Sequence, residues 1–73
     1  MEYNYDEESV LEILQWVRGI KPEDIPGPKF KISAWETIDN NAGFLDSIIF
    51  GVERRNRTSI DTLYRFKEAL ENK

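Results

Sequence analysis

All three prolines of this chain fall within residues 21–30, KPEDIPGPKF, together with one of its four glycines. Proline fixes φ, lacks a backbone N–H and clashes with the preceding helical turn, so this segment cannot continue a helix or form a central strand. We predict a loop in which Pro22 begins one helical turn and in which Ile25 and Phe30 contact the core. A domain boundary here would leave a fragment of about twenty residues, too small to fold alone, so residues 1–73 form a single domain.

The apolar spacing ahead of this loop predicts a helix over residues 7–18. Four residues recur at the i, i+3, i+4, i+7 spacing of one buried helix face: Val10, Ile13, Leu14 and Val17. Asp6 is the expected N-cap, because its carboxylate can accept a backbone hydrogen bond from the first turn. Gly19 is the expected end of the helix.

A second helix is predicted in AWETIDNNAG, residues 34–43. Ser33 followed by Glu36 matches a capping box, in which two side chains satisfy the free N–H groups of a helix start. Three apolar residues behind the cap fall at helical spacing: Trp35, Ile38 and Ala42. We therefore expect Trp35 to be part of the core.

The segment FLDSIIFGVERR, residues 44–55, has an apolar run that fits either a short strand or a helix. The spacing of Ile49 and Val52, Asp46 as a cap and the lack of a hairpin partner favour a third helix. Its Gly51 is an unfavourable residue for a helix interior.

The last segment, IDTLYRFKEALENK, predicts a fourth helix with Thr58 or Ser59 as its cap. Its apolar residues share one helix face: Ile60, Leu63, Phe66 and Leu70. Together these elements predict an all-α domain of four helices, with the proline-rich loop between the first two.

The chain contains neither cysteine nor histidine. Disulfides and thiolate metal sites are therefore excluded, and the commonest general base and metal ligand is missing. No nucleophile stands beside a base and no glycine-rich phosphate loop is present, so we expect no enzyme activity, no cofactor and no metal. The acidic start MEYNYDEES does not resemble a signal peptide, and no apolar run is long enough to cross a membrane, which predicts a cytoplasmic protein.

Charge is unevenly distributed along the chain, whose formal net charge is -4. Residues 1–50 contain four positive and ten negative side chains, a net charge of -6, whereas residues 51–73 contain six positive and four negative, a net charge of +2. Only the C-terminal third can attract a polyanion through its own charge.

Residues 42–70 combine a glycine-containing turn between two predicted helices with a basic loop and a final helix. The characteristic positions are Ala42, Gly43 and Phe44 in the turn, Ser47, Ile49, Val52 and Glu53 in the helix, and Ser59, Ile60, Asp61, Thr62, Leu63, Ala69 and Leu70 after the loop. On these positions the segment resembles the lambda-repressor and Cro family of helix-turn-helix proteins. The resemblance implies a helix-turn-helix domain that regulates transcription, binds duplex DNA as a homodimer and places its third helix in the major groove.

The predicted DNA contacts are Ser47 on the third helix and the loop formed by Arg54, Arg55, Asn56, Arg57 and Thr58. Arginine suits the bidentate geometry of a phosphate, and the free N–H groups at a helix start add partial positive charge. The other interpretation is a solvated loop whose arginines pair with Glu53, Asp61 or the acidic N-terminus.

A protein-interaction module is the alternative function, of the kind used by phage-type or plasmid-type inhibitors and antirepressors. The outward positions of the third helix include Leu45, Ile48 and Phe50, whose side chains cannot hydrogen-bond to base edges. They form either an exposed apolar patch for a protein partner or part of the core. The acidic first twelve residues also favour a protein partner over DNA.

Overall fold

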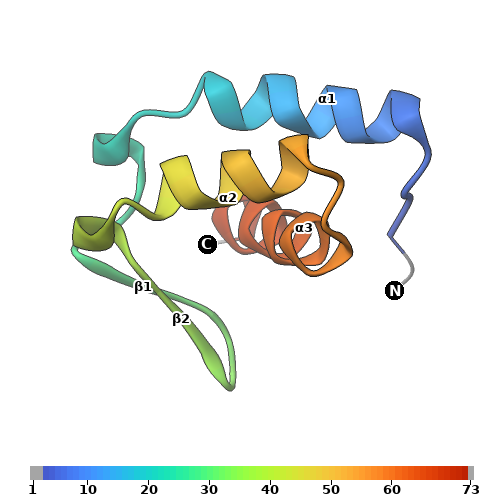
Figure 1. Cartoon of the computed structure of the whole chain (residues 1–73). Coiled ribbons are helices and arrows are strands. Elements are labelled where there is room, and N and C mark those ends of the chain that lie inside the picture. Colours follow the sequence, from blue (N-terminus) through green and yellow to red (C-terminus); the bar gives the residue numbers. More distant parts are fainter. Residues whose placement is uncertain (1–2, 73) are drawn as a thin grey trace.

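The computed structural model describes residues 3–72, which form three helices and a two-stranded antiparallel hairpin. The elements in chain order are α1 (Glu7–Arg18), η1 (Pro22–Asp24), β1 (Lys29–Ser33), β2 (Glu36–Asp39), η2 (Asn40–Ala42), α2 (Phe44–Glu53) and α3 (Arg57–Glu71), where η is a short 3₁₀ turn. The predicted four-helix, all-α helix-turn-helix domain is therefore wrong. Figure 1 shows α2 below α1, with α3 crossing behind α2 and the hairpin on the side of α2 opposite α1.

The first predicted helix is confirmed. Helix α1 covers residues 7–18, and the Asp6 carboxylate caps it by accepting a hydrogen bond from the Ser9 backbone N–H. All four residues of the predicted apolar face are buried: Val10, Ile13, Leu14 and Val17. Residues 21–28 of the proline-rich segment form a loop with one 3₁₀ turn, and Ile25 contacts the core as predicted, but the last two residues of the segment, Lys29 and Phe30, begin β1 instead of ending the loop.

The hairpin replaces the predicted second helix. Strands β1 and β2 pair antiparallel, with Phe30 opposite Ile38 on the face that packs against the core. Lys29 and Lys31 alternate with the inward residues and face solvent. Apolar residues of the two strands therefore lie side by side on one face of the sheet and cover the core together. A helix over residues 34–43 would have left Phe30 without this neighbouring strand.

The residues read as a capping box instead flank the turn of the hairpin, where Ser33 pairs with Glu36. Trp35 lies in this turn and its side chain is 83% exposed, so its predicted place in the core is wrong. The apolar residues of this segment were interpreted as repeating every 3.6 residues, as in a helix, whereas the strand repeat of 2 residues applies here.

Helix α2 confirms the helical interpretation of residues 44–55 but begins earlier than its predicted cap. The N-cap is Gly43 at φ 71°, a left-handed conformation that glycine adopts without strain, rather than Asp46. Further along, Gly51 lies directly against α3, where an added Cβ would be 2.1 Å from Ser59 Oγ. Glycine at this position allows the two helices to approach closely.

Helix α3 covers most of the fourth predicted helix, but its cap is Asn56 rather than Thr58 or Ser59. The Asn56 side-chain oxygen accepts hydrogen bonds from the N–H groups of both of these residues. Phe66 on α3 is fully buried at the centre of the fold. Three rings from other elements contact it edge-on: Trp16, Phe30 and Phe44.

None of the helices formed by residues 3–72 is both long enough and apolar enough to cross a membrane.

Candidate functional site

Arg54 and Arg55 lie in the loop between α2 and α3, whereas Arg57 and Thr58, predicted to belong to the same loop, are the first two residues of α3. Arg55 turns back to α1, where its Nε and Nη2 atoms lie 3.0 and 2.5 Å from the two carboxylate oxygens of Glu7. This bidentate hydrogen bond lowers the pKa of Glu7 and raises the pKa of Arg55. Arg55 is thus engaged in an exposed ion pair within the chain.

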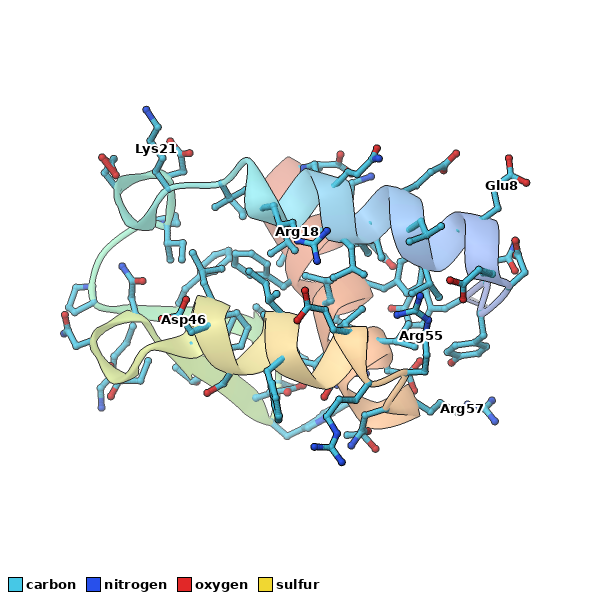
Figure 2. All side chains as sticks on the ribbon, turned by 45° about the horizontal axis from the view of Figure 1, so that its top comes forward. Glu8, Arg18, Lys21, Asp46, Arg55 and Arg57 are labelled. Carbon is cyan, nitrogen blue, oxygen red and sulfur yellow. The ribbon has the colours of Figure 1, made fainter. Side chains whose placement is uncertain are left out.

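Arg57 and Arg54 each lie over an aromatic ring instead. The Arg57 guanidinium is 4.5 Å from the ring centre of Tyr5, whose hydroxyl donates a hydrogen bond to Asp61. The Arg54 guanidinium is 5.3 Å from the ring centre of Phe50. Figure 2 shows Arg55 turned towards α1 and Arg57 pointing away from it. Arg55 and Arg57 nevertheless line one pocket together with Tyr5 and Glu7, whereas Arg54 lies over Phe50 on α2.

The remaining predicted DNA contacts have separate local environments. Asn56 serves as the cap of α3, whereas Ser47 and Thr58 are exposed on α2 and α3. A nearby ion pair between Arg18 and Glu53 joins α1 to α2, and Figure 2 shows Arg18 between these helices. The arrangement is closer to the interpretation in which loop arginines pair with the acidic N-terminus.

The solvent-facing side of α2 has an aromatic residue at its centre. Phe50 is 60% exposed, whereas Ile48 is only 6% exposed and belongs to the core. Leu45 is half-buried and packs against the core. The residues exposed around Phe50 are polar or charged: Asp46, Ser47, Glu53 and Arg54. We call these five residues the α2 face.

The hairpin turn presents a second exposed aromatic residue, Trp35, which the sequence interpretation assigned to the core. Arg65 on α3 holds β2 in place, because its Nε and Nη2 atoms lie 3.1 and 2.8 Å from Glu36 Oε1. The alternation of lysine with Phe30 and Ile32 in KFKIS was the sequence pattern that indicates a strand here.

Comparison of the chain with protein-family models, with curated protein sequences and with solved structures gives no significant match. The resemblance of residues 42–70 to the lambda-repressor and Cro family therefore stays a prediction. Among residues 3–72, no three acidic side chains converge so that they could hold a metal ion.

Proposed function

We propose that this protein is a small protein-binding module whose partner contacts the α2 face, with Phe50 at the centre. The observation that carries this proposal is the 60% exposure of Phe50 in a helix whose other large apolar residues are packed inward. Burying an exposed phenylalanine in a partner contributes about 1.5–3 kcal/mol, which makes it an effective anchor. The neighbouring Arg54 adds a side chain of a type enriched in binding hot spots.

The surroundings of Phe50 support such a contact. An interface typically has an apolar centre enclosed by polar residues that remain partly hydrated at the rim. Asp46, Ser47 and Glu53 provide such a rim here. Because the buried residues Ile48 and Val52 fix α2 against the core, little conformational entropy is lost when Phe50 binds.

The test is site-specific photo-cross-linking with benzoylphenylalanine at position 50. The matched control carries the same group in place of Leu11, which lies on α1 and is 45% exposed. We expect the protein labelled at position 50 to give one discrete cross-linked product. An excess of unlabelled wild-type protein should suppress this product by competing for the partner, whereas an excess of Phe50→Asp protein should not. Identical products from both positions, or equal suppression by Phe50→Asp protein, would contradict the proposal.

Duplex DNA remains the alternative partner, supported by the net positive charge of residues 51–73. It has less support than a protein partner, because Arg55 is engaged in an ion pair with Glu7 and a hairpin stands where the family has its second helix. Fluorescence polarisation with random duplex DNA at low salt separates the two. Strong binding that weakens steeply with salt and disappears in the Arg54→Ala, Arg57→Ala double variant would favour DNA over our proposal.

A further inference from the structure

A groove of about 400 Å³ lies between α1, α3 and the segment that precedes α1. Three aromatic side chains contribute to its walls: Tyr3, Trp16 and Tyr64. Tyr3 and Tyr64 stack nearly parallel, with ring centres 5.0 Å apart and an interplanar angle of 4°. The Tyr64 hydroxyl donates a 2.7 Å hydrogen bond to the backbone oxygen of Asn4, which holds the N-terminal segment against α3. The groove is therefore an aromatic site built from three parts of the chain.

A cation of the chain itself already occupies part of this site. The Lys67 ammonium lies 5.8 Å from the ring centre of Trp16 and 3.6 Å from a carboxylate oxygen of Glu71. Its side chain is 36% exposed, so the flexible stem can swing out into water without disturbing the core. Lys67 shows that the face of Trp16 is accessible to a positive charge.

The groove has an excess of negative charge. Glu12 and Glu68 line it, and neither forms a salt bridge within the described part of the chain. Burial, and after it a hydrogen bond to Glu68, raise the pKa of Tyr3, while the charge of Arg65 acts in the opposite direction. Burial and the charges of Asp6 and Glu12 likewise raise the pKa of Tyr64. A positive ligand is favoured by both carboxylates.

We propose that this groove binds an alkylated ammonium ion, the group shared by methylated lysine side chains and choline. Aromatic faces attract such cations through their negative π-surfaces, and alkylation makes the cation easier to desolvate than the ammonium of Lys67. The carboxylates of Glu12 and Glu68 add electrostatic attraction. This site is separate from the α2 face and does not depend on the function proposed for it.

The test is a titration with tetramethylammonium chloride, followed by the fluorescence of Trp16 in the Trp35→Phe variant. That variant leaves Trp16 as the single tryptophan, and the exposed position of Trp35 makes the replacement safe for folding. We expect a saturable change in emission that sodium chloride at equal ionic strength does not produce. A linear response shared by both salts would overturn the proposal.

Charge variants in the same background test the residues. Glu12→Gln should raise the half-saturating concentration about two- to fivefold, as expected for the loss of one charge interaction at an exposed carboxylate. Lys67→Gln should lower it, because the competing ammonium is removed; a weaker response in Lys67→Gln would contradict the proposed competition. Phe50→Asp, outside the groove, should leave the titration unchanged.

Competition distinguishes the sources of the ligand. Trimethyllysine and phosphocholine both contain the alkylated ammonium group, so at least one must displace tetramethylammonium if the site binds that group. Stronger competition by trimethyllysine indicates a modified protein as the source, and stronger competition by phosphocholine indicates a lipid head group. Failure of both compounds to compete would overturn the proposal.

Discussion

Phe50 and Trp35 are both exposed aromatic residues, but the regions they belong to differ in how extensively they pack against the rest of the fold. Phe50 lies on α2, a helix that contacts both α1 and α3 and buries Ile48 and Val52. Trp35 lies in the turn of a two-stranded hairpin, beyond the residues that contact the core. Figure 1 shows α2 between α1 and α3, and the hairpin turn extending away from the helices.

This difference indicates different roles in binding. A two-stranded hairpin is at best marginally stable by itself, so the position of Trp35 depends on how firmly β1 and β2 are held on α3. Phe50 is already held in place by α2, so binding a partner through Phe50 costs less free energy for ordering the contact. We therefore expect Phe50, rather than Trp35, to fix the orientation of a bound partner.

Phe66→Ala should remove the support of both regions and produce the largest effect. The Phe66 ring contacts Phe30 of the hairpin at a centre-to-centre distance of 6.0 Å and Phe44 of α2 at 5.4 Å. Truncating a buried phenylalanine costs about 3–5 kcal/mol, a large share of the stability of a small domain. Thermal unfolding followed by circular dichroism measures the loss. Leu11→Ala, at an exposed position, should change the free energy of unfolding far less.

Gly51→Ala should affect the α2 region specifically. The new methyl group would lie 2.1 Å from Ser59 Oγ and 2.7 Å from Ser59 Cβ, and the latter cannot move away by rotation of the side chain. Overpacking of about 1–3 kcal/mol should exceed the gain of about 1 kcal/mol in helix propensity. Urea unfolding should therefore show a net loss of stability. Ser47→Ala, on the exposed side of the same helix, is the control and should be nearly neutral.

Glu36→Gln should loosen the hairpin and leave α2 unchanged. It removes the charge that Arg65 binds, at a site where both side chains are 29% exposed, and the expected loss is about 1 kcal/mol. Hydrogen exchange should accelerate at the amide of Ile38 but not at that of Val52. Equal acceleration at both amides would show that the hairpin and α2 open as one unit. Glu23→Gln, an exposed carboxylate in η1, is the matched control.

The helices were predictable where the local spacing of apolar residues favours a helix and the same residues are buried in the core. The buried face of α1 and its Asp6 cap follow from residues within one segment, and so does the buried face of α3. The hairpin was not predictable in this way, because Phe30 lies in the segment read as a loop while Ile38 lies in the segment read as a helix. Only their pairing shows that the two share a face.

The candidate sites also contain residues that the local sequence predicted correctly and residues whose environment depends on distant segments. Leu45, Ile48 and Phe50 were predicted from the sequence to form either an exposed patch or part of the core; Phe50 is exposed, whereas Ile48 is buried. The phosphate-binding interpretation of Arg55 treated the loop as isolated, but the fold brings Glu7 from 48 positions earlier into hydrogen-bonding distance. Long-range ion pairs of this kind leave no trace in the local spacing of residues.

The sequence by itself determined the approximate positions of three helices, although not the caps of α2 and α3, and it determined the interruption at the prolines and the absence of cysteine and histidine chemistry. Each of these depends on near neighbours or on composition. Tertiary structure alone decided that residues 29–39 form a hairpin, that Trp35 is exposed and that Arg55 forms an ion pair with Glu7. The physical reason is that burial and ion pairing are set by contacts between distant segments, and these contacts override a weak local preference.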